Sequence, residues 1–159
     1  MINNGNGEIN ESLIETNIDE IEILVFKIRD QIFGVNVAEV REILMPSPVE
    51  KVPHGHPSVE GVYMPRDVLI TVINLAEYLG IFTDKEDRTL FIAADVDRMN
   101  CAFRVNGVLG IERINVGLIE SAENTLGQSG VVMGIVRAGG NLISLINFAE
   151  IIEDIAPRN

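Results

Sequence analysis

The 159-residue chain contains no tryptophan, and only 5% of its residues are aromatic. It therefore offers few side chains on which exposed nucleic-acid bases could stack. Basic residues are also scarce, because 12 Lys and Arg stand against 24 Asp and Glu, giving a net charge of −12 at pH 7. A protein with this charge repels a phosphate backbone. The composition thus argues against a nucleic-acid partner.

The chain has a single cysteine, Cys101, and no long apolar run. One cysteine excludes an internal disulfide and is typical of a protein kept in the reducing cytoplasm. Apolar stretches such as residues 68–73 are far shorter than the ~20 residues of a membrane-spanning helix. The first residues show neither the basic flank nor the apolar stretch of a signal peptide. We therefore expect a cytoplasmic protein without direct membrane contact.

Residue types that carry catalysis or hold metals are few. His54 and His56 are the only histidines, and without a third histidine or a second cysteine they cannot complete a zinc site. The acidic groups at 84–87 and 95–97 lack the ligand spacing of a calcium loop and fall where β proteins place solvated turns. We therefore predict a protein that is not an enzyme and needs no metal or cofactor.

One stretch of the chain occurs twice. Residues 61–77 return at 134–150 with the same glycine, Leu-Ile, Ile-Asn and Ala-Glu at matching places. A repeat of this length predicts two similar supersecondary units, each with its own turn and strand. The copies differ at the turn, where the first has Pro65, Arg66 and Asp67 and the second has Ala138, Gly139 and Gly140.

The remaining pattern is mainly that of short strands. Branched residues at 22–29 and 32–36 indicate a hairpin, and residues 37–44 have the spacing of a short helix that ends as a strand. Asn106 and Gly107 form a strong hairpin signal. Many short strands with a few single-turn helices predict two small barrels packed together.

The ends of the chain and its middle suggest the domain limits. Residues 1–21 carry acidic side chains without a compensating Lys or Arg, and we predict a flexible tail there. The charged stretch 83–88 is the predicted boundary between two lobes. Asn74 and Asn147 each stand where a side chain can cap a short helix after a strand.

Arg66 is the candidate binding residue that the repeat itself points to. It lies in the turn that the two copies do not share, where it is either a solvated charge or a partner contact. Val40 and Glu42 permit the same two interpretations, because an apolar residue flanked by charges also fits an ordinary strand. The pattern does not decide between them.

Several motifs in order resemble the CheW-like domains, the coupling modules of bacterial chemotaxis. They are the stretch 22–43 with its Phe-Gly-Val-Asn-Val and Val-Arg-Glu-Ile, the prolines at 53 and 57, and Arg66 followed by Val-Ile-Asn-Leu at 72–75. The resemblance covers residues 22–156. The acidic lead-in and the ending are most similar to the N-terminal CheW-like domain of CheV proteins. There a phosphorylatable receiver domain follows, so residues 157–159 would begin the linker to it; a stand-alone coupler is the alternative.

The resemblance implies a fold and a function. The fold is all-β, with two five-stranded SH3-like barrels that share a hydrophobic core, and a C-terminal helix. The function is coupling the cytoplasmic tips of chemoreceptors, the methyl-accepting chemotaxis proteins, to the regulatory domain of the histidine kinase CheA without catalysis. The protein would be cytoplasmic and recruited to membrane-associated receptor arrays. A double barrel that binds a small ligand is the alternative function.

The resemblance also implies site residues. Arg66 keeps the arginine of the family's turn motif, and Val40 and Glu42 keep an apolar-then-acidic pair beside the groove that accepts the receptor tip. Asp67 stands where the family usually has glycine, with Thr71 in place of proline and Asn74 in place of aspartate. Aspartate tolerates the left-handed backbone conformation better than most residues, so we expect the turn to keep its shape.

Overall fold

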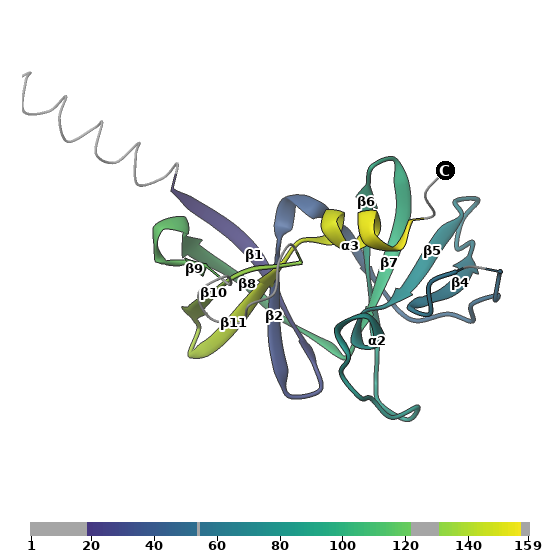
Figure 1. Cartoon of the computed structure of the whole chain (residues 1–159), viewed down its shortest axis with the longest axis horizontal. Helices are drawn as coiled ribbons and strands as arrows, with labels where there is room; N and C mark the ends of the chain where they lie inside the picture. The colour runs from purple at the N-terminus through teal and green to yellow at the C-terminus, as the bar shows by residue number, and fades with distance from the viewer. Residues whose placement is uncertain (1–18, 54, 122–130, 157–159) are drawn as a thin grey trace, which may run out of the picture.

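The computed structural model describes residues 19–53, 55–121 and 131–156, and within them the strands form two sheets. Figure 1 shows the sheets as two lobes, with the C-terminal helix between them. Sheet A has the strand order β8-β1-β2-β11-β10-β9, and sheet B has the order β3-β6-β7-β5-β4. The mainly β architecture predicted from the sequence is confirmed. Sheet B has five strands, and sheet A has six, of which β9 is only two residues long.

The elements have the following bounds. The strands are β1 (Glu20–Ile28), β2 (Gln31–Asn36), β3 (Val40–Leu44), β4 (Val59–Tyr63), β5 (Ile70–Asn74), β6 (Leu90–Val96), β7 (Met99–Val105), β8 (Gly107–Asn115), β9 (Glu120–Ser121), β10 (Val132–Ala138) and β11 (Asn141–Ile146). The helices are α2 (Leu75–Leu79) and α3 (Phe148–Ile155), and the 3-10 helices are η1 (Val37–Glu39) and η2 (Val116–Leu118). The predicted tail over 1–21 lies outside the described residues except for its last three, and β1 already begins at Glu20.

The chain enters sheet B after β2 and returns to sheet A after β7. The charged loop 83–88 lies between two strands of sheet B, so the lobe boundary predicted there is wrong. Asn106 and Gly107 also form no hairpin, because β7 and β8 belong to different sheets. Asn106 instead forms hydrogen bonds with two other segments at the point where the chain returns to sheet A. Its N–H donates to the Lys27 carbonyl at 2.9 Å, its side-chain oxygen accepts from the Arg29 N–H, and its amide donates to the Arg88 carbonyl.

The two copies of the sequence repeat have the same secondary structure. Its first copy forms β4, β5 and α2 in sheet B, and its second forms β10, β11 and α3 in sheet A. Both predicted caps are confirmed, since the Asn74 side chain accepts from the Glu77 N–H and the Asn147 side chain accepts from the Ala149 N–H. The two units therefore share the order of strand, turn, strand and asparagine-capped helix.

The glycine that opens each copy sits at a place where another segment approaches closely. Pairing is irregular at both, with a register shift before Gly61 and another before Gly134. A Cβ atom at Gly61 would overlap the Glu50 carbonyl oxygen, and one at Gly134 would lie 2.6 Å from the Glu120 carbonyl oxygen. Only glycine fits such a backbone approach, which explains why this residue is identical in the two copies.

The segment after β2 was predicted as a short helix over 37–44 that ends as a strand. The structure has a single 3-10 turn, η1, followed directly by β3. The Asn36 side chain accepts from the Ala38 N–H and begins the turn. The segment has three β-branched residues, Val37, Val40 and Ile43. They favour the extended conformation over a longer helix, so the helical part is shorter than predicted.

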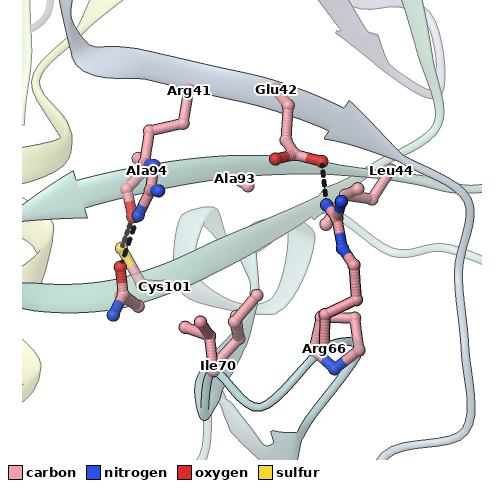
Figure 2. Close-up of a pocket in the computed structure, with 11 residues that line it drawn as sticks. Arg41, Glu42, Leu44, Arg66, Ile70, Ala93, Ala94 and Cys101 are labelled. Carbon is pink, nitrogen blue, oxygen red and sulfur yellow. Dashed lines mark hydrogen bonds and ion pairs between the residues drawn. The ribbon is translucent and has the colours of Figure 1, made fainter.

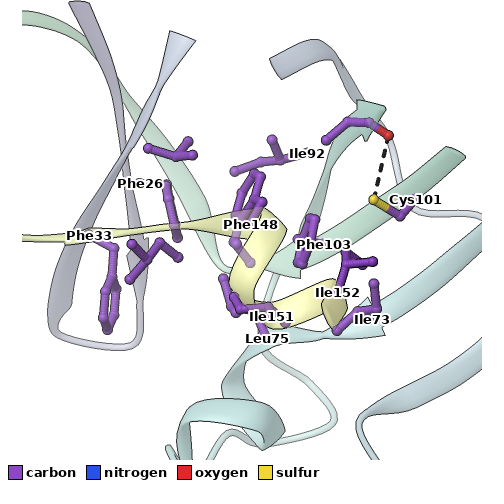
Figure 3. Close-up of a cluster of buried hydrophobic side chains, with 14 of the residues drawn as sticks. Phe26, Phe33, Ile73, Leu75, Ile92, Cys101, Phe103, Phe148, Ile151 and Ile152 are labelled. Carbon is purple, nitrogen blue, oxygen red and sulfur yellow. Dashed lines mark hydrogen bonds between the residues drawn. The ribbon is translucent and has the colours of Figure 1, made fainter. Parts of the chain in front are cut away.

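A shared hydrophobic core joins the two sheets through α3 (Figure 3). Phe26 and Phe33 enter it from sheet A, Phe103 enters from sheet B, and Phe148 enters from α3. The rings of Phe103 and Phe148 stack with centroids 3.9 Å apart and planes 10° apart. Burying each such side chain contributes about 1.5–3 kcal/mol. Each sheet also has a smaller hydrophobic cluster of its own. Each lobe therefore has its own packed interior, and the shared core joins the two lobes.

Candidate partner-binding site

A groove of about 430 Å³ opens on sheet B, between β3 and the loop that joins β4 to β5 (Figure 2). We call it the β3 groove. Its floor is apolar, because Leu44 and Ile70 belong to or pack against the sheet's own core cluster. Charged and polar side chains stand at its rim. The lining residues are Arg41, Glu42, Leu44, Pro65, Arg66, Val68, Ile70, Ala93, Ala94, Asn100 and Cys101.

A β-bulge in β3 decides which side chains reach the groove. Val40 pairs with Ala94 and Glu42 pairs with Ala93, so Arg41 is the extra residue of the bulged strand. Arg41 and Glu42 consequently both extend toward the groove (Figure 2), although neighbours in a regular strand point to opposite faces. The bulge thus brings Arg41 to the face that Glu42 occupies.

The bulge separates two of the residues predicted to act together. Val40 and Glu42 are two apart, which in a regular strand would place both side chains on one face. In the structure Val40 is half-buried and packs against the shared core, and it does not line the β3 groove. The sequence holds no signal for this, since the bulge depends on the pairing of β3 with β6, which follows much later in the chain.

Glu42 and Arg66 do come together at the groove. An Arg66 guanidinium nitrogen lies 3.4 Å from a Glu42 carboxylate oxygen, and the two side chains are 78% and 44% exposed. An exposed pair at this distance contributes less than about 1 kcal/mol, so a partner can displace it. Asp67 has a φ of 62°, the left-handed conformation that we expected aspartate to tolerate in this turn. The loop that carries Arg66 thus forms without the glycine usual at that position.

Arg41 is a groove residue that the sequence analysis missed. One of its guanidinium nitrogens donates a 2.7 Å hydrogen bond to the side-chain oxygen of Asn100 on β7. The two residues are 59 positions apart, and an arginine between a valine and a glutamate looks like an ordinary outward charge. Only the bulge and the pairing of the sheet reveal that it faces the groove.

Cys101 lies at the floor of the groove but is itself buried. Its thiol donates to the Ala94 carbonyl oxygen at 3.5 Å. Burial, together with the negative charge of Asp95, raises the pKa of Cys101 to about 12. The thiol is therefore protonated at neutral pH and is not a nucleophile. Cys101 is thus a small residue of the core.

The described ranges contain no candidate metal site and no candidate membrane-spanning helix. No group of three or more His, Cys, Asp or Glu side chains there could hold a metal ion. His54, one of the two histidines of the sequence, lies outside the described residues. None of the helices in the described ranges is long and apolar enough to cross a membrane.

Comparison with known proteins gives the family. Residues 22–156 match the family of CheW-like domains. The chain belongs to this family. The CheW-like chain is 31% identical over 143 residues to the chemotaxis protein CheW of Thermotoga maritima, an alignment covering 89% of this chain and 93% of the relative. It is 25% identical over 152 residues to the chemotaxis protein CheV3 of Helicobacter pylori, covering 87% of this chain and 49% of CheV3.

A solved structure supports the fold of the CheW-like chain. The scaffolding protein TtCheW of Thermoanaerobacter tengcongensis superposes with a TM-score of 0.73 at 22% sequence identity, covering 80% of this chain and 88% of that one. The family and the named relatives together give the chain a function in chemotaxis, as a coupling and scaffold protein.

Proposed function

We propose that this CheW-like chain links the cytoplasmic tips of chemoreceptors to the regulatory domain of the histidine kinase CheA. It does so in the cytoplasm by binding alone, and it catalyses no reaction. The observation that carries the proposal is the β3 groove, where an apolar floor meets a rim of exposed, loosely paired charges. A surface of this kind suits a helix with one apolar face and polar side chains beside it.

A receptor tip is a helical hairpin, which presents an apolar ridge flanked by polar side chains. We assign its apolar ridge to the floor of the β3 groove and to the apolar side chains exposed around it, in the manner of a helix bound in a hydrophobic groove. These exposed side chains are Met45, Met64, Val68 and Leu69, which are 41–74% accessible to solvent. Contacts of this kind supply most of the affinity at an interface.

Glu42 and Arg66 then set the orientation of the bound helix. Charges at the rim of an interface contribute more to the choice of partner than to affinity. Val40 has a different function in this proposal: it packs against the shared core and fixes the strand that carries Arg41 and Glu42. A substitution of Val40 would change stability as well as binding, so it cannot report on the groove alone.

Isothermal titration of the chain with a receptor-tip fragment, and separately with the CheA regulatory domain, tests the proposal. We expect saturable binding of each fragment to a single site. Failure of both to bind would contradict it. If a metabolite instead raised the melting temperature of the chain in the absence of fragment binding, the chain would be a small-ligand-binding double barrel.

A further inference from the structure

We propose that Arg41 is a second cationic contact of the β3 groove, and that the groove accepts a carboxylate from an acidic side chain on the bound receptor helix. This inference rests on the proposed function and specifies the chemistry of its partner. Arg41 differs from Glu42 and Arg66 because nothing in the sequence pattern marks it. Its assignment depends on the bulge and on the contact with Asn100.

The charge of the groove opposes that of the chain. Arg41 and Arg66 are the cations among its lining residues and Glu42 is the anion, so the lining carries one net positive charge. The whole chain has a net charge of −12. Asp67 follows Arg66 and Asp95 pairs with Asn100 across the strands, but neither makes an ion pair with an arginine within the described ranges. A groove of this sign favours an anionic occupant.

The two arginines are held differently. Arg66 has only the loose contact with Glu42, whereas Arg41 is fixed by a 2.7 Å hydrogen bond to Asn100. That bond uses one of the five N–H donors of a guanidinium group, and the planar group can present the others to both oxygens of a carboxylate. A carboxylate at Arg41 therefore meets donors that are already oriented, which lowers the entropy lost on binding.

The floor of the groove indicates where the carboxylate comes from. Leu44, Ile70 and Ala93 are apolar residues that line the same groove as Arg41 and Arg66. A free small anion would leave that surface exposed to water. A glutamate or aspartate next to the apolar ridge of a helix instead covers the floor while it contacts the guanidinium groups. We therefore assign the occupant to the helical partner.

Arg41→Gln removes the charge and retains an amide that can still donate to Asn100. We expect it to weaken binding of the receptor-tip fragment about fivefold at low salt. The loss should shrink when the titration is repeated at about 300 mM instead of 50 mM NaCl, because salt screens exposed charges. The matched control is Arg113→Gln, which changes the net charge equally at an arginine on β8 of sheet A that is 67% exposed. This control should stay within about twofold of the parent chain.

The outcomes separate this inference from the proposed function. If the parent chain binds the receptor fragment and Arg41→Gln binds equally well, Arg41 makes no contact and the inference fails alone. If Arg41→Gln and Arg113→Gln lose the same affinity for the receptor fragment, only the net charge of the chain matters. That result also overturns the inference about Arg41. If the parent chain does not bind at all, the proposed function fails.

Discussion

Replacing Phe148 by alanine is expected to lower the free energy of unfolding by about 3–5 kcal/mol. The Phe148 side chain is completely buried, and its ring stacks on Phe103 of β7 at a centroid distance of 3.9 Å. Because α3 lies between the sheets, the cavity would open where the two lobes join. A domain of this size has about 5–15 kcal/mol of stability, so a large share would be lost. Urea denaturation followed by circular dichroism at 25 °C measures it.

Leu142→Ala is the matched control for this substitution. Leu142 lies on β11, the strand that leads into α3, but it is 58% exposed. Its truncation should change the free energy of unfolding by no more than about 0.5 kcal/mol. Similar losses at Leu142 and Phe148 would contradict the view that one shared core holds the lobes together.

Arg66→Glu is expected to weaken binding of the receptor-tip fragment at least about tenfold. It should leave binding of the CheA regulatory domain within about twofold. The substitution removes a cation from the rim of the groove and places a second carboxylate beside Glu42, so an acidic partner meets repulsion. Stability should hardly change, because the Arg66 side chain is 78% exposed and its contact with Glu42 is long. Titration calorimetry with both fragments, with a urea denaturation curve alongside, measures these effects.

Exchanging the two charges distinguishes a contact with the partner from a purely internal pair. The double variant Glu42→Arg with Arg66→Glu can form the ion pair again, but with its charges interchanged. If Arg66 contacts the receptor, the double variant still binds the receptor fragment weakly. Full recovery of binding would show that the pair matters only within the chain, and an equal loss for both partners would show that the loop is not specific to the receptor.

Features that depend on a few neighbouring residues could be predicted from the sequence. Asn74 and Asn147 cap their helices as expected, and the units 61–77 and 134–150 form the same strand-turn-strand-helix arrangement. Both depend on hydrogen bonds and turns within a short stretch of chain. The left-handed conformation of Asp67 was expected for another reason, because aspartate stands there where the family resembled usually has glycine and it tolerates that conformation.

Features that depend on distant pairing could not be predicted. Asn106 and Gly107 are a local hairpin signal, yet hydrogen bonds from Asn106 to residues of two other segments make this the return from one sheet to the other. The repeat likewise suggested two consecutive halves, whereas sheet A takes strands from both ends of the described chain. Topology of this kind is set by long-range burial, which local patterns do not contain.

The candidate site shows the same limit. Arg66 and Glu42 were identified and lie together, but the bulge in β3 turned Val40 into the core and brought Arg41 to the groove. A shift of one residue in strand pairing exchanges the two faces of a strand. Val40 was named because of the family resemblance, and a resemblance in sequence does not show where a bulge changes the face to which a side chain points.

Sedimentation velocity of the chain mixed with the receptor-tip fragment and the CheA regulatory domain shows directly whether one molecule joins the two partners. We expect a particle that contains all three components and sediments faster than either pair. Two binary complexes that displace each other, with no larger particle at any concentration, would contradict a coupling function for this chain.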